Sequence, residues 1–233
     1  MIRKTSENAL YLSVALVAAL FSSCGPFKSS SEEHVRDYKF FVSSPELMNE
    51  LGPKIANVLQ KLNDTVGQNV FSLTSDPSTA NSNLSLADLS PRFGSDSIGA
   101  GSSHYKVIHT RSVFDLSKSS VVSEESKYIH GMDVEIDESW FKTWVQELKN
   151  KCGDGFSHSL AFPLSAPLYG NCQRDEMKYF DTMFEILLLH EIGHGLGLDH
   201  TEDHTSVMHP TIDTSRDVAQ FLKVVANIFA SDS

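Results

Sequence analysis

The stretch "FEILLLHEIGHGLGLDH", residues 184–200, places three histidines and a glutamate directly behind an unbroken apolar run. Glycines are interleaved with these polar residues. The apolar run indicates that the segment packs against a core, and burying histidines and a carboxylate costs free energy unless they gain a partner. A bound metal ion would be such a partner, so this segment is the first candidate for a functional site.

Three of its residues have the spacing of metal ligands. His190 and His194 are four residues apart, so on a helix they project from the same face. Gly197 allows the helix to stop and fold back, because glycine tolerates a positive φ. That turn would bring His200 round as a third ligand. Three neutral imidazoles leave the fourth position of a tetrahedral zinc ion open to water, which is typical of a catalytic zinc site.

Glu191 follows the first of these ligands and is the candidate catalytic residue. As a general base it would take a proton from the attacking water and later hand it to the leaving amine. The five fixed residues of H-E-x-x-H-x-x-G-x-x-H are much more specific than H-E-x-x-H alone. The alternative is a group of surface or hydrogen-bonded core histidines without a metal.

The residues "HEIGHGLGLDH" followed by "SVMHP" resemble the metzincin metalloproteases and, among them, the matrixins. Met208 lies eight residues after His200, a spacing similar to the methionine turn of matrixins, so the resemblance implies an apolar floor beneath the zinc. It also implies an endopeptidase with one catalytic zinc and protein or peptide substrates. The expected fold is α/β (α+β), a metzincin-like catalytic domain with one twisted mixed sheet, an active-site helix and a C-terminal helix.

Neighbouring residues place the chain nearer to matrixins than to astacins or serralysins. Pro210 stands where those two families carry a tyrosine, and Thr201 replaces the usual matrixin serine. His209 replaces the tyrosine that matrixins often carry after the methionine, which leaves the detail of the primed-side wall open. By the same resemblance Ile186, one turn before His190, would line a substrate pocket together with His209 and favour an apolar residue there.

Upstream of the motif the pattern predicts alternating strands and helices. Strands are expected in "HVRDYKFFVSS", "NVFSLT", "YKVIHT" and "YIHGMDVEID". A helix capped by Ser44 is expected to begin at Pro45, with Pro53 delaying or kinking it. Residues 75–103, rich in Ser, Asn, Asp and Gly, are expected to form a long surface loop.

Two further helices are expected towards the C-terminus. In the active-site helix, "DTMFEILLLHEIGHGLG", Thr182 and Glu185 have the spacing of a capping box at its start. The last segment, "SRDVAQFLKVVANIFA", has an amphipathic helical pattern.

An acidic row alternates with apolar residues in the last of the expected strands. Asp133, Glu135 and Asp137 would share one face, which is more typical of a solvated face than of a calcium site. Calcium is therefore possible but unassigned. Four scattered histidines are expected to be surface residues rather than ligands of a structural zinc: His104, His109, His130 and His158.

The N-terminus has the features of a bacterial lipoprotein signal. Arg3 and Lys4 precede thirteen largely apolar residues, too few to span a bilayer, and then "LFSSC". Lipidation at Cys24 would anchor the protein to a membrane, and ordinary signal-peptidase cleavage is the alternative. Because Gly25 follows the cysteine, we expect an exported outer-membrane lipoprotein. The expected organisation is a signal peptide (1–23), a lipid-anchored tether (24–33) too short for a folded propeptide, and the catalytic domain (34–233).

Two cysteines remain after Cys24. In an oxidising compartment, Cys152 and Cys172 are expected to form a disulfide, with two free thiols as the alternative. "CGP" at residues 24–26 faintly resembles the cysteine switch of some zinc proteases, but the basic and acidic neighbours of that switch are missing.

The charge of the chain argues against nucleic acid as a partner. Its 233 residues carry a formal net charge of -11. An RNA-maturation endonuclease family has a similar histidine spacing, yet it typically lacks the glutamate and the methionine turn and is cytosolic. A non-catalytic zinc-binding lipoprotein is the second alternative. We expect a monomeric peptidase.

Overall fold

The computed structural model describes residues 33–34, 37–94, 97–115, 120–152 and 174–230. Six strands form one sheet: β1 (Glu33–His34), β2 (Tyr38–Val42), β3 (Phe71–Thr74), β4 (Ser82–Ala87), β5 (Gly99–Asp115) and β6 (Ser120–Asp137). The helices are α2 (Pro45–Val66), α3 (Ser90–Phe93), α4 (Glu138–Cys152), α6 (Arg174–Gly195) and α7 (Val218–Ala230), with a 3-10 turn η1 (Pro77–Thr79). One mixed sheet with several helices confirms the expected fold class.

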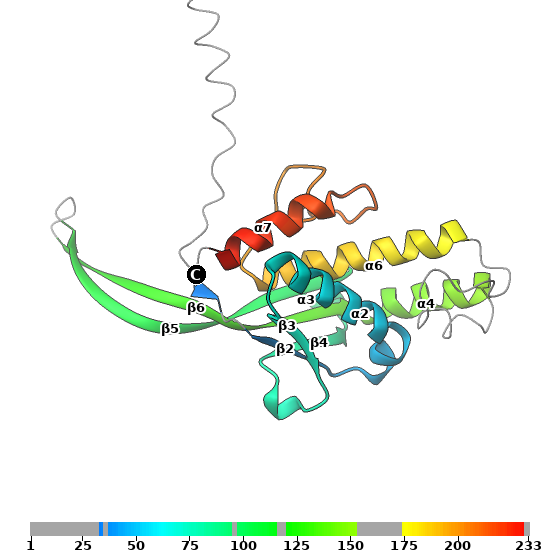
Figure 1. Ribbon diagram of the computed structural model, residues 1–233, viewed down its shortest axis with the longest axis horizontal. Helices are drawn as coiled ribbons and strands as arrows, with labels where there is room; N and C mark the ends of the chain where they lie inside the picture. The colour runs from blue at the N-terminus through cyan, green and yellow to red at the C-terminus, as the bar shows by residue number, and fades with distance from the viewer. Residues whose placement is uncertain (1–32, 35–36, 95–96, 116–119, 153–173, 231–233) are drawn as a thin grey trace, which may run out of the picture. The chain divides into compact units, whose positions relative to one another are not determined.

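The sheet places an antiparallel strand beside the helix α6. The strand order is β1-β6-β4-β2-β3, and these neighbours run parallel to one another. β5 pairs with β6 in the antiparallel direction, and its first residues, 99–103, lie opposite residues 132–136 at the end of β6. Both β5 and β6 contact α6 (Figure 1). Residues far apart in the sequence are thereby brought to the same side of α6.

The long helix α2 begins where the sequence predicts. The Ser44 side chain accepts a hydrogen bond from the Leu47 N–H at 3.3 Å, and Pro45 occupies the first turn. Pro53 lies inside the helix without delaying its start or ending it, and Leu51 and Ile55 on either side are buried in the core. The helix stops at Gly67, whose φ of 74° is left-handed.

The expectation of a surface loop over residues 75–103 is wrong. This segment contains η1, β4, α3 and the start of β5. β4 lies inside the sheet between β2 and β6, and Leu84 is fully buried. Its sequence, "SNLSLA", does not indicate a central strand. Only alternate residues of a strand point towards the core, and one of these in β4 is the polar residue Ser82.

Two helices also differ from the sequence prediction. α6 begins at Arg174, so Thr182 and Glu185 lie within it and form no capping box. The Thr182 hydroxyl instead donates to the Lys178 carbonyl at 2.8 Å, and Glu185 forms an ion pair with Lys61 of α2. α4 was not predicted at all, although its buried residues have helical spacing: Phe141, Trp144, Val145 and Leu148.

The core lies between the sheet and the helices. α2 contacts α6, α7, β2 and β3, and α4 contacts β4 and β6 (Figure 1). Tyr38 of β2 stacks on Phe71 of β3 with ring centroids 5.4 Å apart, and Phe229 of α7 meets both rings edge-on. Among the helices of the described residues, none has the length and apolar character needed to cross a membrane.

Candidate metal centre and catalytic site

The C-terminal end of α6 folds back on itself at a glycine. Gly197 has a φ of 81°, and its N–H donates to the His194 carbonyl at 2.9 Å. The Leu198 N–H then donates to the Gly193 carbonyl at 2.9 Å, which closes the helix with a tight reversal. The chain leaves this turn towards His200, as the sequence predicts.

The reversal brings the three predicted ligands together. The Nε2 atoms of His190 and His194 are 3.1 Å apart, those of His194 and His200 3.1 Å, and those of His190 and His200 3.3 Å. Three ring nitrogens cannot all be hydrogen-bonded to one another. A tetrahedral zinc with nitrogens at about 2.0–2.1 Å would hold them about 3.3 Å apart. The arrangement therefore fits a shared metal ion, and it is the one such histidine, cysteine or carboxylate cluster among the described residues.

Hydrogen bonds on the other ring nitrogen fix the direction of two of these histidines. His190 Nδ1 is 2.7 Å from the Val207 carbonyl oxygen, and His194 Nδ1 is 2.8 Å from that of Leu198. A carbonyl can only accept, so both Nδ1 atoms carry the proton and both Nε2 atoms keep their lone pairs. This is the orientation that metal-binding histidines require.

Burial keeps these two imidazoles neutral. Burial is the main cause that lowers the pKa of His190 to about 4, and the positive charges of neighbouring histidines and of Arg216 lower it further, against the hydrogen bond to Val207. Burial likewise lowers the pKa of His194. At pH 7 both rings are therefore available to a cation without first losing a proton.

Glu191 is covered by the first residues of β5. The residue is 4% exposed. Burial raises the pKa of its carboxyl to about 8, and a hydrogen bond with the Gly101 backbone opposes this rise. A Cβ at Gly99 would lie 2.4 Å from Glu191 Oε1, and one at Gly101 would lie 2.0 Å from the Glu191 carbonyl oxygen. A Cβ at Gly101 would clash with backbone, so glycine is required there, whereas a larger residue at Gly99 would displace the Glu191 carboxyl. A cation bound nearby would return the carboxyl to its ionised form.

Met208 packs beneath the ligand-bearing turn of α6. It is 2% exposed, and a Cβ at Gly193 would lie 2.4 Å from its Sδ atom, so the glycine between the two helical histidines makes room for the methionine. The Met208 carbonyl accepts a hydrogen bond from the Thr201 N–H at 3.0 Å, directly after the third histidine. Met208 thus lies against the helix that carries His190 and His194, and its role as a methionine turn stays a prediction.

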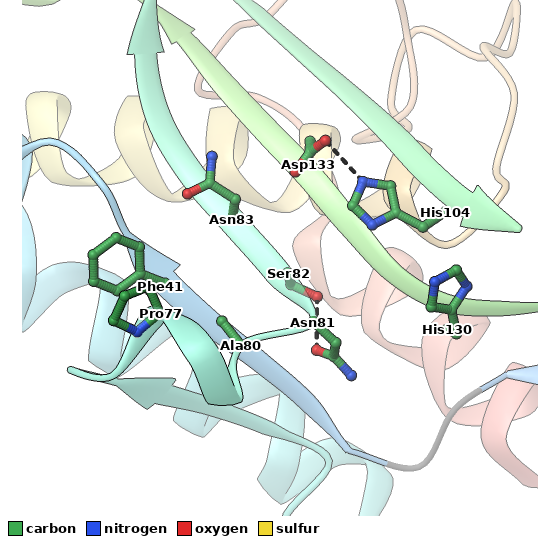
Figure 2. A pocket seen from close by; sticks show the side chains of 9 residues that line it. All are labelled: Phe41, Pro77, Ala80, Asn81, Ser82, Asn83, His104, His130 and Asp133. Carbon is green, nitrogen blue, oxygen red and sulfur yellow. Dashed lines mark hydrogen bonds and ion pairs between the residues drawn. The ribbon is translucent and has the colours of Figure 1, made fainter.

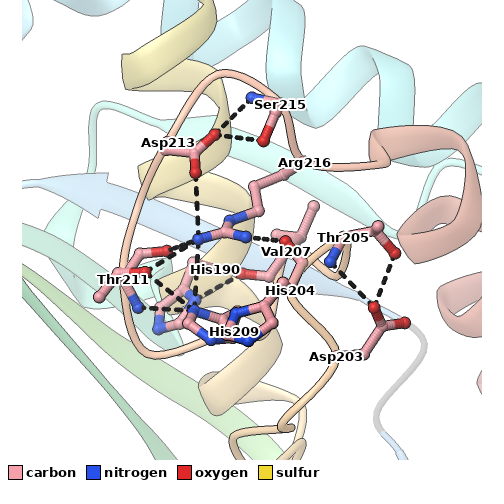
Figure 3. Close-up of polar contacts among 10 residues, drawn as sticks. All are labelled: His190, Asp203, His204, Thr205, Val207, His209, Thr211, Asp213, Ser215 and Arg216. Carbon is pink, nitrogen blue, oxygen red and sulfur yellow. Dashed lines mark hydrogen bonds and ion pairs between the residues drawn. The ribbon is translucent and has the colours of Figure 1, made fainter.

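The two residues expected to line a substrate pocket are both buried. Ile186 is fully buried, and His209 is 8% exposed within a polar cluster around Arg216 (Figure 3). Their contact with substrate stays a prediction. Cys24 and Cys172 lie outside the described residues, so the lipid anchor and the disulfide between Cys172 and Cys152 at the end of α4 also stay predictions.

A second group of polar side chains lies on the sheet face opposite the helices. His104 Nε2 is 2.7 Å from Asp133 Oδ2, and both line a pocket of about 450 Å³ with His130 and Asn81 (Figure 2). The other two residues of the acidic row contact residues of the same chain. Glu135 pairs with Arg92 at 2.6 Å, and Asp137 accepts from the Trp140 N–H at 2.8 Å. A calcium site on this row stays unassigned.

Two features of the site were not found from the sequence. The glycines of β5 that cover Glu191 lie about 90 positions before it, and the pattern "GAGSS" gave no sign of the contact. Arg216 was seen only as part of the last helix pattern, whereas its side chain is 3% exposed in the loop before α7. A lone arginine between two acidic residues, "DTSRD", was the one available signal.

The comparison with known protein families agrees with this geometry. The matrixin family model matches residues 105–224, which is more than half of the chain and includes all three histidines, Glu191 and Met208. No curated protein matches the chain. The family match covers the same residues that form the three-histidine cluster. The chain therefore belongs to the matrixin family.

Proposed function

We propose that this protein is a zinc-dependent endopeptidase whose single catalytic zinc is held by His190, His194 and His200. The observation that carries the proposal is the convergence of three Nε2 atoms within 3.3 Å of one another. His200 is exposed whereas His190 is buried, so the cluster opens to solvent on one side. A substrate could approach from that side.

Side chains and backbone carbonyls of the site would have different roles in peptide hydrolysis. A zinc ion in the cluster would supply Lewis-acid chemistry, activating water and polarising the scissile carbonyl. Glu191 takes the proton of the attacking water and delivers it to the leaving amine. The Val207 and Leu198 carbonyls keep His190 and His194 turned towards the metal. Met208 closes the site from below and keeps water away from the back of the ligands.

The proposal is tested with the full chain, a mixed peptide library and a chelator. We expect the purified protein to contain one zinc per chain and to cleave internal bonds of the library. Chelation should stop cleavage, and added zinc should restore it. A protein that holds one zinc and leaves every peptide intact would instead favour the non-catalytic zinc-binding lipoprotein.

We further propose that Cys24 anchors the enzyme to the bacterial envelope. The support is the basic start, the short apolar run and "LFSSC" in the sequence. Mass spectrometry of the mature N-terminus should show a lipid-modified Cys24, and Cys24→Ala should yield a protein without lipid. An unmodified N-terminus at another residue would point to ordinary signal-peptidase cleavage.

A further inference from the structure

Two metal-binding histidines depend on a loop that has no helix or strand of its own. We call residues 201–217 the Met-turn loop; it joins the end of the His200 turn to α7. Its Val207 carbonyl accepts from His190, and its Met208 carbonyl accepts from the residue after His200. Something must hold this loop in shape, because a small shift of the Val207 carbonyl would release the His190 ring.

Arg216 links the two halves of the Met-turn loop. Its Nη1 donates to the His204 carbonyl, before Met208. Its Nη2 donates to the Thr211 carbonyl at 2.5 Å and hydroxyl at 2.9 Å, and approaches His209 Nδ1 at 3.3 Å, all after Met208 (Figure 3). One guanidinium thus connects His204 to Thr211, and the segment between them contains Val207 and Met208.

Hydrogen bonds from Thr211 also hold the imidazole ring of His209 in place. The Thr211 N–H donates to His209 Nδ1 at 3.2 Å, and the Thr211 hydroxyl lies 2.9 Å from the same atom. Because His209 Nδ1 accepts from the Thr211 N–H, it carries no proton, so the Thr211 hydroxyl donates to it. Arg216, Thr211 and His209 therefore form one hydrogen-bonded unit directly after the methionine.

Burying the charged side chain of Arg216 costs desolvation free energy. The Arg216 side chain is 3% exposed, and its carboxylate partner within the described part of the chain, Asp213, is 3.4 Å away and 53% exposed. Its Nε atom has no hydrogen-bond partner among the described residues. A buried charge with incomplete pairing adds little net stability. The burial of Arg216 is therefore better explained by the loop conformation that its hydrogen bonds define.

We propose that Arg216 is a positioning residue for the zinc site: it holds the Met-turn loop so that the Val207 carbonyl orients His190. The proposal rests on zinc binding at the three histidines, which is part of the proposed function, but not on peptide cleavage. The planar fork of arginine reaches His204 and Thr211 at once, which the single ammonium of lysine cannot do.

The test compares zinc affinity in Arg216→Lys and Arg216→Met with the wild-type protein. Groups that orient metal ligands typically change affinity by about 10–100-fold when they are removed. We expect zinc binding, measured by competition with a chelator, to weaken about 10-fold in Arg216→Lys and up to about 100-fold in Arg216→Met. The visible spectrum of the cobalt-substituted protein should also change, because it reports the ligand geometry.

The matched control is Arg92→Lys, which alters an exposed arginine of α3 whose ion-pair partner is Glu135 of β6. It should leave zinc affinity and the cobalt spectrum unchanged. If Arg216→Lys lowers the melting temperature but binds zinc within about twofold of wild type, Arg216 is only structural and the proposal is wrong. If Arg216→Met does not fold, Arg216→Lys decides alone. A wild-type protein that binds zinc without cleaving peptides would refute the proposed function and leave this test intact.

Discussion

Replacing Glu191 with glutamine is expected to lower peptide cleavage by about 10³-fold or more while the protein keeps its zinc. Glutamine has almost the shape of glutamate but cannot accept the proton of the attacking water, and general acid–base catalysis typically contributes about 10²–10⁴-fold. The three histidines are untouched by the change, and two of them are fixed by backbone carbonyls. Metal content and kcat/KM are measured on the same sample.

The matched control for this variant is Glu185→Gln on the same helix. Glu185 lies before the metal-binding turn, with its side chain 28% exposed and paired with Lys61 of α2. The Glu185→Gln protein should cleave peptides at the wild-type rate. If Glu191→Gln retains zinc and cleaves as fast as Glu185→Gln, Glu191 is not the proton carrier.

The same substitution is expected to change how the stability of the metal-free protein depends on pH. The pKa of Glu191 is raised to about 8 in the metal-free fold, from an ordinary value of 4.5. A raised carboxyl pKa means that folding favours the protonated form, so stability is present below pH 4.5 and is lost as the pH rises towards 8. From pH 5 to pH 8 this group should remove about 3–4 kcal/mol of unfolding free energy.

Glutamine cannot ionise, so chelated Glu191→Gln should lack this loss and be the more stable protein at pH 8. Urea unfolding at pH 5 and pH 8 measures the difference, with Glu185→Gln again as the control. His190 acts in the opposite direction: its pKa is lowered to about 4, so its stabilising contribution is lost as the pH falls from about 6.5 to 4. Equal slopes for Glu191→Gln and wild type above pH 5 would contradict the buried position of Glu191.

The three-histidine cluster could be predicted from the sequence because it depends on short spacings. Three residues of helix separate His190 from His194, and one glycine reverses the chain towards His200, so local geometry brings the three together. The same locality explains why α2 was predicted with its cap, Ser44.

Three of the missed features depend on contacts between distant segments. β4 lies inside the sheet despite its polar sequence, because the neighbouring strands supply its hydrogen bonds whatever its side chains are. The cover over Glu191 comes from Gly99 and Gly101 on another strand. Arg216 reaches back to His204, and no periodic pattern marks such a contact. Sequence periodicity reports which residues are buried, but not which buried segments meet.

The most direct test of the zinc peptidase is to titrate zinc into the metal-free protein while cleavage of one library-derived peptide is followed. A single metal held by His190, His194 and His200 predicts that activity rises linearly and stops rising at one zinc per chain. Activity that is unchanged by chelation, or that is absent when one zinc is bound, would contradict the account.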